Sequence, residues 1–264
     1  MRNLEVLCCC LVSSSYLNPT DSSPLEGESQ TIRALLKIRE LLIQGVFKPG
    51  ERIREVPLSS RLQVSRTPLR LALDRLADEG LLEACPKGGF NAREFTREDV
   101  LDAIDLRGVL EGTAARFAAE RLQSPEEAAP LYECIEATEG LLRRRMPGVD
   151  LIREYMEVNT AYHANLLRLA KSPMLARLME KVLALPFASP SAVVFAETES
   201  EDLREALVIS NSHHVAIADA IVAREGSRAE AVAREHSRMA RRSVTLALKE
   251  QRFEQIPGGS LIKL

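Results

Sequence analysis

Apolar residues recur at helical spacing in three segments near the start of the chain. Gly45 and Gly80 follow the first and third segments, where glycine commonly ends a helix. Pro68 falls in the first turn of the third segment, a position that tolerates proline. The expected helices cover residues 32–44, 57–62 and 67–79, and short expected strands cover 81–84 and 90–92 on either side of a Pro-Lys-Gly-Gly turn. Three helices and a hairpin predict a winged helix-turn-helix over residues 31–95.

Helical spacing then continues to about residue 252. Three capping-box patterns mark expected helix starts, in which a hydroxyl and a carboxylate three residues later satisfy free backbone N–H groups; they are Thr96 with Asp99, Ser124 with Glu127, and Ser227 with Glu230. The expected helices cover 96–122, 124–145, 149–171, 173–185, 202–209, 211–224 and 228–252. The sequence therefore predicts a mainly α-helical protein, with a helical bundle over 96–252, a disordered tail over 1–30 and a C-terminal tail over 253–264.

Composition narrows the class of protein. Aromatic residues make up only 4% of the 264 residues, which disfavours a β-sandwich or barrel. No apolar run approaches the roughly 20 residues that span a bilayer, so we expect no membrane partner. The five cysteines include no CxxC spacing and no disulfide framework, which favours a reducing compartment such as the cytoplasm.

Charge is distributed unevenly along the chain. The net charge is −3 overall, but residues 31–95 carry twelve basic and eight acidic side chains. A basic segment within an acidic protein is typical of a module that binds a polyanion, although many solvated surfaces carry as much charge.

The third helix of the predicted winged module begins with residue types that suit contact with duplex DNA. Ser65, Arg66 and Thr67 lie at its start, where hydroxyls, backbone N–H groups and the helix dipole can hold a phosphate. Arg66 and Arg70 are four residues apart and share one face, from which a guanidinium can reach guanine in the major groove. The alternative is a solvated face of an amphipathic helix.

Residues 64–73 read Val-Ser-Arg-Thr-Pro-Leu-Arg-Leu-Ala-Leu, and Glu-Gly-Leu follows at 79–81. This run closely resembles the hallmark of the GntR family of bacterial transcription regulators. The resemblance implies that Ser65, Arg66, Thr67 and Arg70 contact the operator, with the Gly88-Gly89 wing tip at the minor groove. It also implies a homodimer on palindromic double-stranded DNA, because protein two-fold symmetry imposes operator symmetry.

The bundle resembles the effector-binding and dimerisation domain of the FadR-type branch of this family, the FCD domain. Residues 107–115 fit its Arg-x-x-Leu-Glu-x-x-Ala-Ala register. In this context we expect Arg107 to pair with a small carboxylate effector, through the two-pronged geometry of guanidinium and carboxylate. An ion pair with Glu111, four residues on, is almost equally favoured.

Three of the four histidines lie in otherwise apolar stripes of three predicted helices; these are His163, His214 and His236. A buried polar ring needs a partner, and imidazoles are common ligands of transition metals. The FCD resemblance implies a divalent metal held by these histidines and by residue 159, where Asn159 stands in place of the usual Asp. Three imidazoles suit zinc, nickel, cobalt or manganese, and we expect the uncharged amide to make the site weaker than one with Asp. A metal-free polar pocket is the alternative.

Together these features predict a ligand-responsive regulator of a metabolic operon, usually a repressor in the family it resembles, and not an enzyme. Two other readings stay open. One is a helical metal-dependent hydrolase with an attached DNA-binding module, because open metal positions can activate water. The other is a winged-helix protein-interaction module with an inert bundle.

Overall fold

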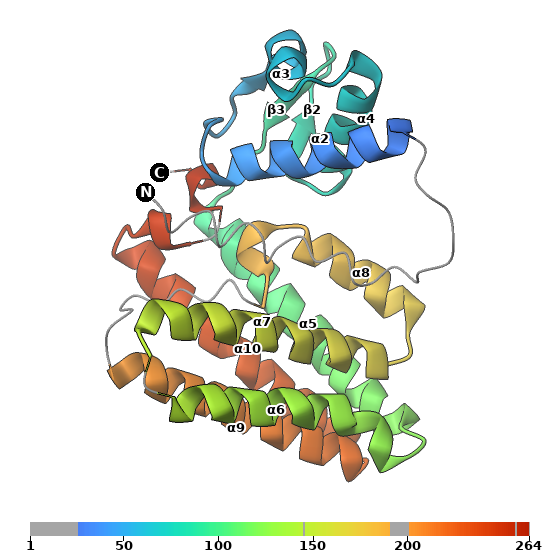
Figure 1. The fold of residues 1–264 in the computed structure, drawn as a ribbon, viewed down its shortest axis with the longest axis vertical. Helices are drawn as coiled ribbons and strands as arrows, with labels where there is room; N and C mark the ends of the chain where they lie inside the picture. The colour runs from blue at the N-terminus through green and yellow to red at the C-terminus, as the bar shows by residue number, and fades with distance from the viewer. Residues whose placement is uncertain (1–25, 145, 191–200, 257, 264) are drawn as a thin grey trace. The chain divides into compact units, whose positions relative to one another are not determined.

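The computed structural model describes residues 26–144, 146–190, 201–256 and 258–263 (Figure 1). Its residues group into two units. The first contains residues 26–99, 184–187 and 258–263, and the second contains the described residues of Val100–Leu183 and Ala188–Ile256. The expected tail over 1–30 falls mainly outside the described residues. Its last five residues differ from the prediction, because they already belong to the first described helix.

The first unit is the predicted winged helix-turn-helix. Its elements are α2 (Glu26–Ile43), β1 (Arg52–Ile53), α3 (Glu55–Leu62), α4 (Arg66–Asp78), β2 (Leu82–Ala84) and β3 (Phe90–Ala92). The strands form an antiparallel sheet in the order β1-β3-β2. Strand β1 was not predicted, because two residues are too few to show a period. The apolar stripes predicted for the helices form the core, where Ile38, Leu42, Leu69, Leu73 and Leu76 are all fully buried.

The C-terminal segment corrects the prediction of a tail over 253–264. It forms two short 3-10 helices, η3 (Phe253–Gln255) and η4 (Gly259–Leu261). Leu261 and Ile262 are buried. The backbone of Phe95 donates to Leu261 and accepts from Lys263, at 2.9 and 2.8 Å. Leu261 and Ile262 thus add apolar surface to the first unit, and the backbone hydrogen bonds with Phe95 hold this segment against it.

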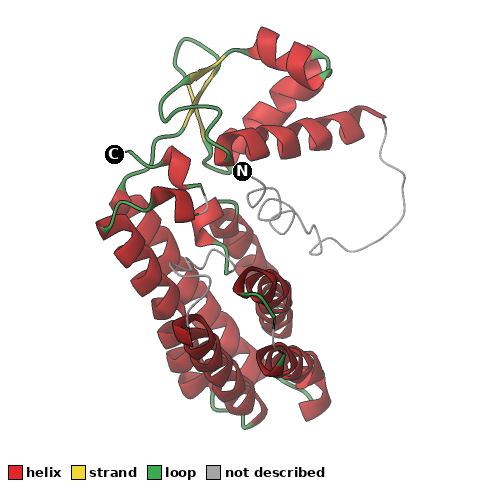
Figure 2. Cartoon of the chain, turned by 60° about the vertical axis from the view of Figure 1, so that its left-hand side comes forward, coloured by secondary structure: helices red, strands yellow, loops and turns green. Residues whose placement is uncertain are grey.

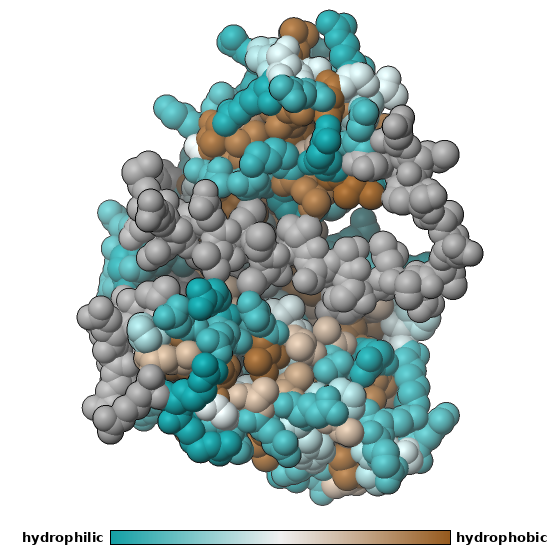
Figure 3. Space-filling model, viewed as in Figure 1, coloured by the Kyte–Doolittle hydropathy of each residue, from teal (hydrophilic) through white to brown (hydrophobic). Residues whose placement is uncertain are grey.

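The second unit is helical, as predicted, and Figure 2 shows helices as its only regular elements among the residues drawn in colour. Its elements are α5 (Arg97–Arg121), η1 (Pro125–Ala128), α6 (Ala129–Arg143), α7 (Gly148–Leu169), α8 (Pro173–Leu183), α9 (Glu201–Val222) and α10 (Gly226–Lys249), with η2 (Pro186–Ala188) at the boundary of the units. The two helices expected over 202–209 and 211–224 are one helix, α9, because no glycine or proline separates them. On the face seen in Figure 3, hydrophilic and apolar residues alternate over this unit.

Alanines on α5 form much of the second core. Ala114, Ala115, Ala118 and Ala119 are each at most 1% exposed and pack with residues of α7, α9 and α10. A helix face of such small side chains lets neighbouring helices approach closely. Gly108 shows how close α10 comes, because a Cβ added there would lie 2.1 Å from the Ser237 hydroxyl. The spacing of the helices therefore depends on small residues along α5.

One of the three predicted capping boxes forms. The Thr96 hydroxyl accepts from the Asp99 N–H at 3.0 Å, and the Asp99 carboxylate accepts from the Thr96 N–H at 2.7 Å. These bonds lower the pKa of Asp99. Ser124 instead precedes η1 and makes no capping bond with its side chain. Ser227 lies inside α10, which begins at Gly226, so it is not a cap either.

Replacing Thr96 with alanine is expected to lower the free energy of unfolding by about 1 kcal/mol, the usual loss when a capping hydroxyl is removed. Urea denaturation followed by circular dichroism measures the change. Ser124→Ala is the matched control, because Ser124 lies at a helix start without a capping bond, and its effect should stay within about 0.5 kcal/mol. Equal losses in the two variants would contradict this role for Thr96.

Candidate functional site

The start of α4 is an exposed polar surface. Ser65 is its N-cap residue, and Ser65, Arg66, Thr67 and Arg70 are all exposed. The opposite face of the helix is buried in the core of the first unit, which holds the polar face outward. The side chain of Ser65 makes no capping hydrogen bond, so its hydroxyl is not occupied by the first turn of the helix. The four residues predicted to contact DNA therefore share one accessible surface.

Some arginines in the described part of the first unit form ion pairs with acidic side chains, unlike Arg66 and Arg70. Arg39 pairs with Glu79, and Arg93 lies 4.0 Å from Glu83. Within the described residues, neither Arg66 nor Arg70 forms an ion pair. Two exposed guanidinium groups one helical turn apart are the arrangement that duplex DNA can neutralise.

The predicted wing is a tight turn that requires its two glycines. Gly88 and Gly89 have φ angles of 82° and 80°, which residues other than glycine rarely adopt. Arg52, on β1, donates to the Gly88 carbonyl at 2.6 Å, and a Cβ at position 89 would lie 3.0 Å from its guanidinium. Arg52 thus holds the wing tip. Sequence reasoning missed this role, because the contact joins residues 36 positions apart in the chain.

In the second unit, the three predicted histidines meet. His163 on α7, His214 on α9 and His236 on α10 each offer a ring nitrogen, and these nitrogens all lie within 4.8 Å of one another. The ring centroids of His214 and His236 are 4.6 Å apart, and those of His163 and His236 are 5.3 Å apart. Because each histidine interrupts the apolar stripe of its helix, packing of the three stripes brings the rings together.

Burial keeps the rings of His214 and His236 neutral. It lowers the pKa of His214 well below its usual value, and the neighbouring imidazoles lower it further. Burial and the nearby His163 lower the pKa of His236 to about 3. Nε2 of His214 and Nδ1 of His236 are buried and have no hydrogen-bond partner among the described residues. Buried nitrogens with free lone pairs lose hydration without compensation, and a metal cation is a group that would satisfy them.

Asn159 lies one turn before His163 on α7, and its side chain is engaged by the protein. Its amide oxygen accepts from the Tyr155 hydroxyl at 3.2 Å, and its amide nitrogen donates to the Pro190 carbonyl at 3.1 Å. The side chain is buried. Its coordination of a metal therefore stays a prediction, and it would have to be made alongside these bonds.

Arg107 and Glu111 lie on α5 and are both buried. Nη1 of Arg107 donates to the carbonyls of Ala188 and Ser189 at 3.1 and 2.6 Å, and Nε lies 3.6 Å from Glu111. The other oxygen of Glu111 lies 2.9 Å from Nδ1 of His163. Burial alone would raise the pKa of Glu111, but His163 and then Arg107 bring it down to about 2. Glu111 was predicted only as a partner of Arg107, because its contact with His163 joins helices distant in sequence.

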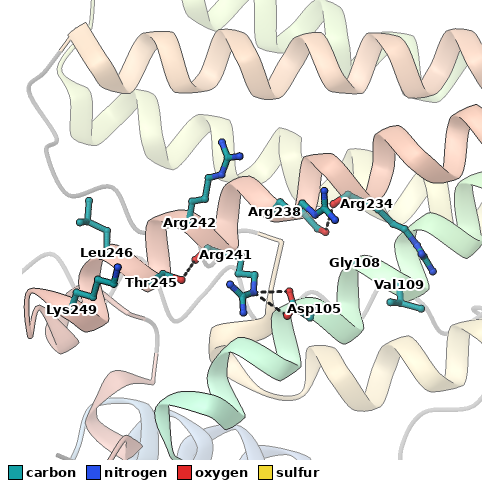
Figure 4. A pocket seen from close by; sticks show the side chains of 11 residues that line it. Asp105, Gly108, Val109, Arg234, Arg238, Arg241, Arg242, Thr245, Leu246 and Lys249 are labelled. Atoms are coloured by element: carbon teal, nitrogen blue, oxygen red, sulfur yellow. Dashed lines mark hydrogen bonds and ion pairs between the residues drawn. The ribbon is translucent and has the colours of Figure 1, made fainter.

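A groove with a volume of 710 Å³ lies between α5 and α10 (Figure 4). Asp105, Gly108 and Val109 line it from α5, and Arg234, Ser237, Arg238, Arg241, Arg242, Thr245, Leu246 and Lys249 line it from α10. Arg241 donates to Asp105 at 2.9 Å across the groove. Val109 and Leu246 are 43% and 47% exposed, so apolar surface lies among charges of both signs.

The fold and these surfaces define a regulatory protein that joins a winged helix-turn-helix to a helical domain with a buried polar site. Residues 30–91 match the model for bacterial regulatory proteins of the gntR family, and residues 102–239 match the model for the FCD domain. The chain belongs to the GntR family, in the branch that carries an FCD domain.

Named relatives agree with this assignment. The chain is 35% identical to the Nta operon transcriptional regulator of Aminobacter aminovorans over 136 residues, which are 52% of this chain and 61% of that relative. It is 24% identical to the HTH-type transcriptional repressor GlaR of Escherichia coli over 200 residues, 74% of this chain and 86% of GlaR. The solved structure of E. coli McbR/YncC shares the fold, with a TM-score of 0.57, 21% identity and coverage of 85% and 98% of the two chains. None of the described helices is long and apolar enough to cross a membrane.

Proposed function

We propose that this protein is a ligand-responsive transcription regulator that binds operator DNA through α4 and responds to a small carboxylate bound in its helical domain. The observation that carries this proposal is the pair of exposed guanidinium groups on α4, which lack ion-pair partners within the described chain, in a winged helix-turn-helix. Transcription regulators among the named relatives support it. A repressor is the favoured sense, by analogy with GlaR, and the site of action is the bacterial cytoplasm, where operators lie.

On DNA, the start of α4 would enter the major groove. Ser65, Thr67 and the first backbone N–H groups would hold a phosphate, while Arg66 and Arg70 reach base edges. The Gly88-Gly89 tip, held by Arg52, would approach the minor groove. Two copies of the chain would read an inverted repeat, because a two-fold dimer imposes two-fold symmetry on its operator.

We place the interface between the two copies at the groove between α5 and α10. Asp102 and Asp105 are exposed on α5, and Arg238 and Arg242 are exposed on α10. A two-fold arrangement can set the acidic side of one copy against the basic side of the other, with Leu246 and neighbouring apolar residues between them. Interfaces commonly combine an apolar centre with arginine in this way.

Leu246→Asp is expected to shift this protein from dimer to monomer at micromolar concentration, because it buries a charge in the apolar centre of the interface. Light scattering after size-exclusion chromatography measures the mass. Leu178→Asp on α8 is the matched control, because Leu178 is 48% exposed and Leu246 is 47% exposed. Equal masses for both variants and the unmodified protein would contradict this interface.

The helical domain would hold a divalent metal through His163, His214 and His236, with zinc, nickel, cobalt and manganese as the candidates. The buried nitrogens without hydrogen-bond partners in the described chain are the observation that fits such an ion. When bound, the ion would act as a Lewis acid that attracts a carboxylate oxygen of the effector.

Arg107 would bind the other end of that carboxylate. Its guanidinium already donates to two carbonyl oxygens, so an effector would replace Ala188 and Ser189 as its acceptors. Such an exchange would couple effector binding to the position of Ala188 and Ser189. The effector and DNA would then change each other's affinity by one common factor.

No catalytic step is part of this proposal. The hydrolase alternative gains no support from the named relatives, which are regulators. A thermal-shift screen of small organic acids, with and without zinc, tests the sensing function, because a ligand that binds only the folded protein raises its melting temperature. We expect at least one acid to add to the shift that zinc produces. A screen in which no acid moves the transition would contradict the sensing function.

A further inference from the structure

The histidine cluster presents an electrostatic problem. Three neutral imidazoles and the uncharged amide of Asn159 provide no negative charge for a buried divalent ion, and burying an uncompensated charge is costly. The amide of Asn159 is moreover hydrogen-bonded to Tyr155 and Pro190. A metal site built from these four residues alone would be cationic.

A carboxylate reaches the cluster from a fourth helix. The Glu111 side chain on α5 is only 5% exposed, and its Oε1 lies 2.9 Å from Nδ1 of His163. A nitrogen this close to a carboxylate oxygen is favourable only if the nitrogen carries the proton. The proton on Nδ1 leaves the lone pair of the imidazole on Nε2. A metal-binding histidine commonly donates its other N–H to a carboxylate in this way.

The other neighbour of Glu111 is less closely engaged. Arg107 lies 3.6 Å from the second carboxylate oxygen, which is beyond hydrogen-bond distance, and its Nη1 is committed to two backbone carbonyls. That second oxygen is buried and has no hydrogen-bond partner among the described residues. The closest contact of Glu111 is therefore His163, and the ion pair with Arg107 does not account for the position of the carboxylate. With Glu111 included, four helices of the unit contribute to the cluster.

We propose that Glu111 is the positioning residue of this metal site and the source of the negative charge that Asn159 does not supply. Its charge lies 2.9 Å from Nδ1 of His163 and keeps the proton on that nitrogen, which fixes Nε2 as the metal-binding atom. This inference rests on the metal site of the proposed function.

Cobalt(II) is the probe that tests the proposal, because its visible absorption reports ligand geometry as well as occupancy. Metal-free full-length protein is titrated with cobalt(II), and the affinity is measured against a chelator of known strength. Glu111→Gln is expected to weaken cobalt(II) binding about 10- to 100-fold, the usual effect of losing such an outer partner. Glu111→Asp should recover part of that loss. The matched control is Glu98→Gln, which removes an exposed carboxylate in the first turn of the same helix.

A second readout separates positioning from mere stabilisation of the fold. Nitrogen-15 NMR of the histidine rings should show one tautomer of His163, protonated at Nδ1, and a mixture of tautomers in Glu111→Gln. If Glu111→Gln binds cobalt(II) as tightly as the unmodified protein and keeps the same tautomer, this inference is wrong and the metal site stands. If the unmodified protein itself binds no cobalt(II), the proposed metal site is wrong, and this inference is wrong as well.

Discussion

Arg70→Ala is expected to abolish the preference of the protein for its operator while leaving its helical content unchanged. Arg70 is exposed and has no ion-pair partner in the described part of the first unit, so its loss removes no internal contact that holds α4 in place. A two-pronged arginine–guanine contact contributes about 1–3 kcal/mol of discrimination, and a dimer makes it twice. The operator is obtained by selecting duplexes from a random pool, and fluorescence anisotropy then measures affinity for that duplex and for a scrambled one.

Arg75→Ala is the matched control for this prediction. Arg75 is also an exposed arginine of α4, but it lies in the last turn of the helix, away from the surface formed by Ser65, Arg66, Thr67 and Arg70. We expect it to reduce affinity for both duplexes slightly and equally, as loss of one distant positive charge should. Base readout by Arg70 is excluded if Arg70→Ala still prefers the selected duplex as strongly as the unmodified protein does.

His214→Ala is expected to remove the stabilisation that metal gives to the fold. His214 is 1% exposed, and its Nε2 has no hydrogen-bond partner among the described residues. A metal at a concentration about 100 times its dissociation constant stabilises the folded state by about 2.7 kcal/mol. This variant should lose that stabilisation. Differential scanning fluorimetry with zinc and with a chelator measures the difference in melting temperature.

His213→Ala serves as the control for His214→Ala. It removes the adjacent histidine, which does not belong to the group of three nitrogens within 4.8 Å. We expect this variant to keep the zinc-dependent shift. A zinc-dependent shift of the same size in His214→Ala would show that the three histidines do not hold the metal.

Periodicity predicted the winged module and most helices, because each helix buries one continuous apolar stripe. It failed where structure depends on partners distant in sequence. Strand β1 exists because Arg52 and Ile53 pair with β3, and two residues have no detectable period. Leu261 and Ile262 belong to the core through backbone bonds with Phe95, which no local pattern reveals.

In the site, too, local patterns predicted some residues, and contacts distant in sequence fixed the others. His163, His214 and His236 could be predicted to converge, because each occupies an apolar stripe and stripes pack together. The carboxylate of Glu111 could not be assigned to His163, because its only local partner in the sequence was Arg107, and the distance between α5 and α7 is a property of the fold. The bonds that Asn159 makes with its surroundings were hidden for the same reason.

Affinity for the selected inverted repeat, compared with a scrambled duplex of equal length at physiological salt, is the measurement that decides whether this protein reads DNA sequence. Our account predicts at least a thousandfold preference for the selected repeat, as is usual for specific regulators, and a steep fall of both affinities with salt. Equal affinity for the two duplexes would contradict it.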